Sequence, residues 1–98
     1  MRRPTIVYIL ASQRRGTIYI GVSTNIHQRL EQHRNGAFEG FTKTYAVKRL
    51  VHFEVFDNVI DGRRREHQLK TWRRQWKIEL IERQNPDWND LSRDLPLG

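Results

Sequence analysis

The sequence predicts an α+β domain in which three short strands and about three helices follow one another in the order β-β-α-β-α-α. Residues 5–22 and 49–56 hold short runs rich in β-branched and aromatic residues, which is typical of strands. Elsewhere apolar residues recur every three or four positions, which is typical of helices packed on a sheet. We expect one domain over residues 1–98, with its core at about 5–91 and a short C-terminal tail, because this length suits a single modest core.

The first two strands lie in the stretch TIVYILASQRRGTIYIGV. Residues 6–10 are apolar on both faces, as expected of a strand covered on each side. Residues 17–22 alternate, so that the aliphatic side chains face one way and Tyr19 the other. The short turn between the runs predicts an antiparallel hairpin, with Gly16 available for a positive φ. If Tyr8 lies opposite Tyr19 in the ladder, the two rings are close enough to interact.

The segment IHQRLEQHR predicts the first helix, because candidate N-cap residues precede it and Asn-Gly follows it. Ile26 and Leu30, at positions i and i+4, mark its buried stripe. Arg29 and His33 have the same spacing along the margin of that stripe. The helix therefore presents an arginine and a histidine, one turn apart, beside the hairpin.

The middle of the chain predicts a loop and then a third strand. Residues 36–48 show no clear period and include three aromatic residues that are expected to be partial anchors. Residues 49–56 alternate again, with the odd-numbered residues from Val51 to Val55 as the expected core face. The Asp-Asn pair that follows is expected to cap the next helix.

The second helix, at about 59–72, is the most charged part of the chain. Glu66 falls on its sheet-facing stripe and is the one acidic residue between Gly62 and Ile78, among seven basic residues. A third helix is predicted at about 73–84, followed by a turn-rich tail. The tryptophans are interpreted as core or docking residues and not as base-stacking surfaces: Trp72, Trp76 and Trp88.

The charge of the chain points to a polyanionic partner. Its formal net charge is +7, with fourteen arginines against four lysines. Nucleic acid is the commonest polyanion, and the arginine fork matches pairs of phosphate oxygens. The alternative explanation of the charge is a surface adapted for solubility. We expect six basic residues to bind backbone phosphates, or alternatively to form a solvated helix face: Arg63, Arg64, Arg65, Arg73, Arg74 and Lys77.

Two classes of protein are excluded by composition. The chain has no cysteine, so it has neither disulfides nor thiolate metal sites, and a reducing cytoplasmic location is expected. Its apolar runs are far shorter than the roughly 20 residues that span a bilayer, so no membrane partner is expected.

Five polar or aromatic residues from the hairpin and two helices form a recognisable pattern. An I-V-Y run ends at Tyr8, ten residues follow, and a Y-I-G run begins at Tyr19. Arg29 and His33 come next, and Glu66 lies in the basic second helix. This order resembles the GIY-YIG nuclease superfamily, in particular its small stand-alone bacterial members, over nearly the whole chain.

The resemblance implies a three-stranded antiparallel sheet flanked by helices and hydrolysis of nucleic-acid phosphodiesters with one Mg²⁺ or Mn²⁺ ion. DNA is the expected substrate, with RNA also open. By resemblance, Tyr8 and Tyr19 border the scissile phosphate, and one of them acts as, or positions, the general base. Arg29 stabilises charge on the phosphate, His33 assists proton transfer or binds phosphate, and Glu66 holds the metal.

The chain also departs from the family pattern. Its first motif lacks the glycine, and Val22 stands where repair-type members often have lysine. The family's late asparagine is assigned to Asn89, which follows a tryptophan, in preference to Asn85.

Each of these residues also has an interpretation without catalysis. The two tyrosines alone are ordinary strand aromatics, and Arg29 alone is a surface charge. His33 is then a residue that interacts favourably with the C-terminal dipole of its helix. Glu66 is then the partner of Arg29 or a neighbouring arginine. These interpretations correspond to a non-catalytic nucleic-acid-binding module on the same fold, which is the alternative function.

Overall fold

The computed structural model describes residues 3–36 and 46–96. These residues form one antiparallel sheet in the order β2-β1-β3 with three α-helices around it, which confirms the predicted fold class and element order. The elements are β1 (Thr5–Ala11), β2 (Ile18–Ser23), α1 (Ile26–Arg34), β3 (Arg49–Phe56), α3 (Val59–Thr71), α4 (Arg74–Gln84) and a short 3-10 helix (Ser92–Asp94).

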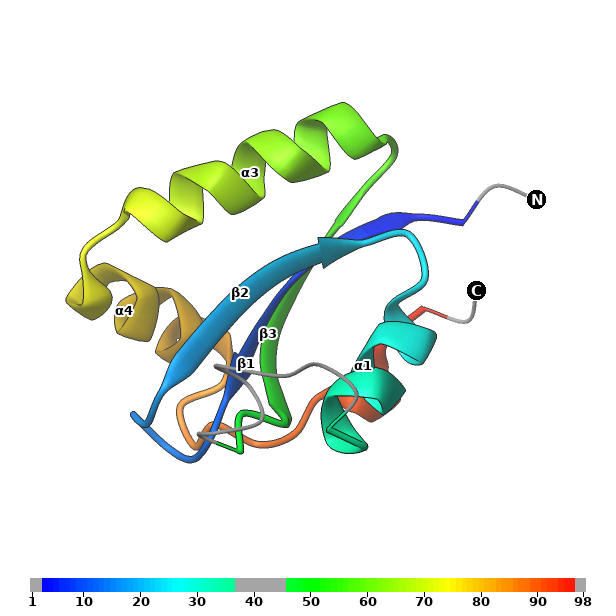
Figure 1. Cartoon of the computed structure of the whole chain (residues 1–98). Helices are drawn as coiled ribbons and strands as arrows, with labels where there is room; N and C mark the ends of the chain where they lie inside the picture. The colour runs from blue at the N-terminus through cyan, green and yellow to red at the C-terminus, as the bar shows by residue number, and fades with distance from the viewer. Residues whose placement is uncertain (1–2, 37–45, 97–98) are drawn as a thin grey trace.

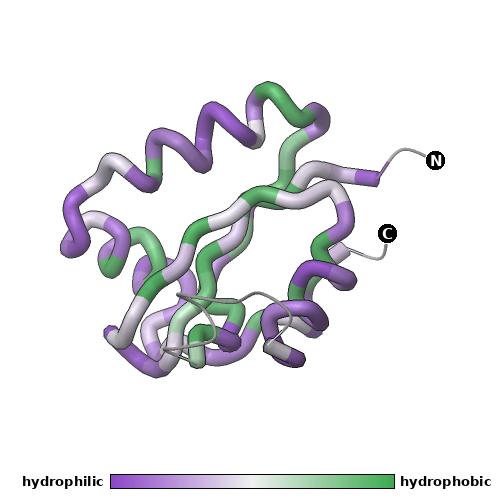
Figure 2. The backbone as a smooth tube through the Cα atoms, viewed as in Figure 1, coloured by the Kyte–Doolittle hydropathy of each residue, from purple (hydrophilic) through white to green (hydrophobic). Residues whose placement is uncertain are grey.

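The central strand β1 is buried along its whole length, as predicted for a strand covered on both faces. On one face Val7 and Ile9 pack with Leu69 of α3 and with α4. On the other face Leu10 packs with Leu30 of α1 and with the C-terminal segment. Figure 1 shows α3 and α1 on opposite sides of the sheet, and Figure 2 shows the hydrophobic positions gathered along the strands between them.

The structure gives the register of the β1–β2 hairpin, which the sequence left open. Tyr8 lies opposite Gly21, and Tyr19 lies opposite Leu10, so the two tyrosines are not directly paired. The tyrosines are instead diagonal neighbours on the face that carries α1.

The turn between the strands sets this register. The backbone N–H of Ser12 donates to the carbonyl of Thr17 at 3.0 Å, so the ladder starts only at the pair Ala11 and Ile18. Arg15 adopts the left-handed conformation with φ of 55°, and the glycine after it, which was expected to do so, does not.

A β-bulge in β3 breaks the predicted alternation of that strand. The β1–β3 ladder passes over Val51 between two successive residues of β1. The side chains therefore change sides: Val51 packs with α3 and α4, whereas Phe53 packs with α1. Val55 is 50% exposed, so the prediction of one core face with Val51, Phe53 and Val55 is wrong.

Helix α3 is fixed at its start and along its sheet-facing side. Asn58 accepts a hydrogen bond from the N–H of Asp61 at 2.9 Å, as a helix cap does. Gly62 is buried against the sheet, where an added Cβ would lie 2.5 Å from Cγ2 of Thr5. Leu69, two turns later, is fully buried. The predicted stripe of this helix thus faces β1 and β2.

The tail docks on the sheet as predicted. Trp88 is fully buried, and its indole N–H donates to Glu82 at 2.7 Å. The N–H of Leu91 donates to the carbonyl of Leu50 at 2.8 Å, which ties the tail to the start of β3.

The three aromatic residues of the predicted loop, Phe38, Phe41 and Tyr45, lie outside the described residues. Among the residues that are described, none of the helices has the length and apolar character needed to cross a membrane.

The close packing of Gly62 predicts an unusual response to substitution. Alanine is normally favoured over glycine inside a helix by about 1 kcal/mol. Here the added methyl group meets a buried, β-branched Thr5, so we expect Gly62→Ala to lower the free energy of unfolding by about 1–3 kcal/mol. Urea denaturation followed by circular dichroism measures this.

The matched control is the same change in a Thr5→Ser background, which lacks Cγ2. There the cost of Gly62→Ala should largely disappear. A Gly62→Ala protein that is more stable than wild type would contradict this packing.

Candidate active site at the edge of the sheet

The site is built around the ring of Tyr8, which lies across the backbone of Gly21. Tyr8 is almost fully buried. A Cβ added to Gly21 would lie 2.5 Å from Cζ of Tyr8 and would overlap with its hydroxyl oxygen. Because Gly21 belongs to β2, an edge strand, its missing side chain lets the hydroxyl of Tyr8 extend over that strand.

Tyr8, Tyr19 and His33 form one aromatic group on the α1 face of the sheet. The ring centroids lie 6.4 Å apart for the two tyrosines, 6.1 Å for Tyr8 and His33, and 5.1 Å for Tyr19 and His33. The hydroxyl of Tyr8 is 3.4 Å from Nε2 of His33. The burial of Ile26 and Leu30, as predicted, turns α1 so that His33 is also buried.

Charges from two helices act on the hydroxyl of Tyr8. Burial raises the pKa of Tyr8 well above its ordinary value, and the neighbouring Tyr19 raises it further. The positive charge of Arg29 on α1 lowers this pKa, and the negative charge of Glu66 on α3 raises it. Residues from opposite faces of the sheet therefore meet electrostatically at this hydroxyl.

His33 is held in its neutral form. Burial lowers the pKa of His33 below its ordinary value of 6.5, and the positive charge of Arg29 lowers it further. A neutral imidazole has one nitrogen that accepts a hydrogen bond. The pair of Tyr8 and His33 can therefore hand a proton from the phenol to the ring.

Glu66 is a half-buried carboxylate with a partner in its own helix. Its oxygen lies 3.2 Å from Nζ of Lys70, and the side chains are 21% and 51% exposed. The interpretation without catalysis expected Arg29 or another arginine as the partner of Glu66. The structure shows an i,i+4 pair with lysine. Such a partly exposed pair contributes less than about 1 kcal/mol, so Lys70 can leave the carboxylate at little cost.

The donor set fits a hydrated hard cation. Within the described ranges 3–36 and 46–96, no group of three or more histidine, aspartate or glutamate side chains is placed to enclose a metal ion. Mg²⁺ keeps several waters and is often held by one or two carboxylates. Glu66 is therefore the carboxylate that would hold a Mg²⁺ or Mn²⁺ ion.

A polar hollow of about 370 Å³ lies beside one member of this group, Arg29. Arg29 lines it from α1 and Arg63 from α3, so two arginines from opposite sides of β2 face the same space. Four polar residues between β2 and the second turn of α1 also line it and were not predicted as site residues: Ser23, Thr24, Asn25 and Gln28. Their position directly after the Y-I-G run was the available signal.

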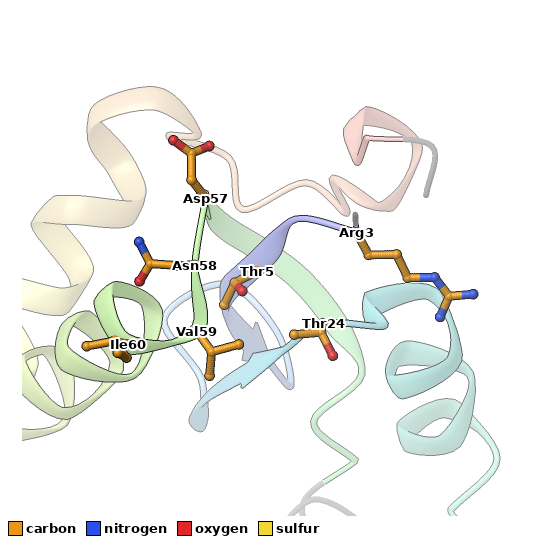
Figure 3. A pocket seen from close by; sticks show the side chains of 7 residues that line it. All are labelled: Arg3, Thr5, Thr24, Asp57, Asn58, Val59 and Ile60. Carbon is orange, nitrogen blue, oxygen red and sulfur yellow. The ribbon is translucent and has the colours of Figure 1, made fainter. Parts of the chain in front are cut away.

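A larger hollow of about 700 Å³ adjoins the first and shares Thr5, Thr24 and Val59 with it. Figure 3 shows Val59 and Ile60 at the start of α3, with Thr24 and Arg3 across from them. This second hollow lacks Arg29, and its lining includes the acidic residue Asp57. The smaller hollow is therefore the better candidate for the reacting phosphate.

The candidate asparagines lie in the turn that follows α4. Asn85 is buried, and its amide donates to the carbonyls of Val51 and Asn89 at 3.0 Å each. Its side-chain oxygen accepts from the N–H of Asn89, also at 3.0 Å. Asn85 thus holds the turn, whereas Asn89 is an exposed residue within it.

The six predicted phosphate-binding residues differ in their surroundings. Arg65 donates to Glu54 at 2.7 Å, and Arg74 donates to the backbone carbonyls of Arg15 and Gly16 at 2.6 and 2.7 Å. These two side chains therefore have roles within the fold. The other four lie on α3, α4 or the junction between them: Arg63, Arg64, Arg73 and Lys77.

Comparison with known proteins gives the family. Residues 4–79 match the model of the GIY-YIG catalytic domain. A UPF0213 protein of Syntrophus aciditrophicus is 38% identical over 82 residues, which is 83% of this chain and 92% of the relative. A UPF0213 protein of Staphylococcus saprophyticus is 36% identical over 66 residues, which is 67% of this chain and 80% of the relative.

A solved structure supports the same fold. The solution NMR structure of a UPF0213 protein from Bacillus halodurans matches with a TM-score of 0.56 at 24% identity, covering 92% of this chain and 95% of that one. Since the matched domain includes the hairpin, α1, β3 and α3, the chain belongs to the GIY-YIG catalytic domain family.

Proposed function

We propose that this protein is a divalent-metal-dependent endonuclease that hydrolyses phosphodiester bonds in DNA. The observation that carries the proposal is the convergence on one hydroxyl: Tyr8 touches His33, and the charges of Arg29 and Glu66 both act on it. Phosphodiester hydrolysis needs an aligned nucleophile, a path for its proton and positive charge on the phosphate oxygens. This group of residues supports the proposal with a path for the proton, through Tyr8 and His33, and with the positive charge of Arg29.

The phosphate would lie in the hollow between α1 and α3. Arg29 and Arg63 both line it, and an arginine fork binds two phosphate oxygens at once. As charge builds up on the phosphate oxygens in the transition state, Arg29 stabilises it. The hydroxyl and amide groups that also line the hollow orient the backbone of the substrate.

The proton of the attacking water would leave through Tyr8 and His33. A raised pKa makes the phenolate of Tyr8 scarce at neutral pH, so Tyr8 alone is a poor base. Its hydroxyl can instead accept a proton from water while it donates its own to Nε2 of neutral His33. Tyr19, packed beside both rings, would position the water or the phosphate.

Glu66 is the residue that would hold Mg²⁺ or Mn²⁺. A bound divalent ion supplies Lewis-acid stabilisation of the phosphate oxygens. Glu66 itself would exchange its weak pairing with Lys70 for the ion, and the negative charge that raises the pKa of Tyr8 would be compensated.

A non-catalytic nucleic-acid-binding module is the second candidate. It is favoured by two observations, the pairing of Glu66 with Lys70 and the raised pKa of Tyr8. In that case the arginines bind phosphate and the tyrosines only pack. The two candidates differ in what Glu66 does.

We expect Glu66→Ala to lower the rate of DNA cleavage by more than about 100-fold, because a bound cation contributes several kcal/mol to the transition state. The affinity for DNA, measured by fluorescence anisotropy in EDTA, should change little. Cleavage is measured on a panel of single-stranded, duplex and branched DNA, and on RNA, with Mg²⁺ or Mn²⁺.

Glu79→Ala is the matched control, since it removes the same charge from an exposed position on α4. It should cleave like wild type. If Glu66→Ala remains active, the metal assignment is wrong. If wild type leaves the whole panel uncut, the binding module becomes the better account.

The neutral state of His33 predicts the acid side of the pH profile. Because burial and Arg29 lower the pKa of His33 below its ordinary value, the ring becomes mostly charged only in buffer more acidic than pH 6.5. The cleavage rate should therefore hold down to about pH 6.5 and fall in more acidic buffer. An acid limb centred above pH 7 would contradict this role.

His33→Gln is the companion variant. It keeps a hydrogen-bonding side chain but cannot take up the proton, so it should be slow and should lose the acid limb assigned to His33. Circular dichroism checks that the variant is folded.

A further inference from the structure

Trp76 is an exposed tryptophan on a basic helix, and the fold does not explain it. Its side chain is 48% exposed, whereas Trp88 is fully buried and Trp72 packs against the core. The interpretation of all three tryptophans as core or docking residues therefore holds for Trp72 and Trp88 but is wrong for Trp76.

Trp76 ends a row of stacked groups at the junction of α3 and α4. The guanidinium of Arg65 lies 5.1 Å from the ring centroid of Trp72, and the rings of Trp72 and Trp76 meet edge to face at 6.2 Å. Arg65 is itself fixed by a two-pronged pairing with Glu54, at 2.7 and 3.1 Å. The inner part of the row is thus rigid, and its outer ring faces solvent.

The outer ring already holds a flat cationic group. The guanidinium of exposed Arg73 lies 5.4 Å from the centroid of Trp76. A nucleic-acid base is also flat, although uncharged, and can stack in this place while Arg73 turns outward to a phosphate. Without a ligand, Arg73 covers part of a ring that would otherwise be more exposed.

The charge around Trp76 suits a polyanion. The first turn of α4 contains no acidic residue, and it holds Arg74 and Lys77 beside Trp76. These two basic residues, with Thr17 and Ile18, also line a hollow of about 310 Å³ beside the start of β2. An aromatic ring within a basic surface is the arrangement that single-stranded nucleic acid binds, by stacking and by phosphate contacts together.

The position of the row fits the candidate active site. Glu66 lies on α3 five residues before the end of that helix at Thr71, a rise of about 8 Å along the axis. A nucleic-acid strand bound near Glu66 can therefore continue along α3 to the α3–α4 junction. Figure 1 shows this junction on the same side of the sheet as α4.

We propose that Trp76 stacks on an unpaired base of the nucleic-acid substrate, with Arg73 and Lys77 on the flanking phosphates. This rests on the proposed nuclease function and narrows its substrate class to strands with a single-stranded or unpaired segment. A regular duplex keeps its bases stacked on one another and offers no such face along its length.

The test compares one labelled oligonucleotide as a single strand and as a blunt duplex, by fluorescence anisotropy in EDTA so that no cleavage occurs. Trp76→Ala should weaken binding of the single strand by about 5- to 150-fold, the effect of losing one stacked base. Binding of the duplex should change less than about twofold. Trp76→Phe, which keeps an aromatic face, should retain most of the affinity.

Two further measurements make the result specific. Ile60→Ala removes another exposed apolar side chain, at the start of α3, and should leave both affinities unchanged. A single strand with a run of abasic sites should bind wild type about as weakly as the intact strand binds Trp76→Ala, and the variant should not distinguish the two strands.

Equal losses for single strand and duplex, unchanged single-strand binding by Trp76→Ala, or no binding of nucleic acid by wild type would each overturn the stacking proposal. Because binding is measured without metal, this outcome is separate from that of the cleavage assays. A stacking signature in a protein that cuts nothing would keep the stacking contact but assign it to a nucleic-acid-binding module, and would remove the catalytic proposal.

Discussion

Tyr8 lies across Gly21, its direct partner in the β1–β2 ladder, and any side chain at position 21 would occupy the space of the phenol. This contact carries the hydroxyl of a buried central strand across to the edge of the sheet. It also brings Tyr19 into a diagonal position beside Tyr8, at 6.4 Å between centroids. The glycine that ends the Y-I-G run is therefore a steric requirement for the tyrosine that ends the first run.

From that contact the electrostatics of the site follow. A buried phenol with a raised pKa does not ionise by itself, so the neighbouring groups decide what it does. Arg29 opposes the effect of burial, and the same charge helps to keep His33 neutral as a proton acceptor. Glu66 raises the pKa of Tyr8, whereas Arg29 lowers it, and a bound cation would compensate the charge of Glu66. Elements on both faces of a thin sheet are thus coupled through one hydroxyl group.

Local patterns in the sequence predicted the elements well. The first helix and the third strand occupy the predicted residues, Ile26–Arg34 and Arg49–Phe56. The register was not predictable, since the turn closes through a backbone hydrogen bond from Ser12 to Thr17 that a composition of turn residues does not specify. The bulge at Val51 left no signal either, because valine suits both sides of a strand.

The candidate site was likewise predicted only in part. The order of the tyrosines, Arg29, His33 and Glu66 predicted the family, but not the distances or the i,i+4 pairing of Glu66 with Lys70. Exposure of Trp76 depends on the angle between α3 and α4, which is a tertiary property. From the sequence this tryptophan is interpreted as a core or docking residue, and only the structure shows that its ring is half exposed.

The most direct test that Glu66 and the two tyrosines belong to one site is a crystal soaked in Mn²⁺ and measured at the manganese absorption edge. The account predicts one anomalous peak at the carboxylate of Glu66, on the side that faces Tyr8 and Tyr19, with Lys70 moved away from its present position 3.2 Å from that carboxylate. A crystal in which Glu66 keeps its pairing with Lys70, and manganese binds elsewhere or not at all, would contradict it.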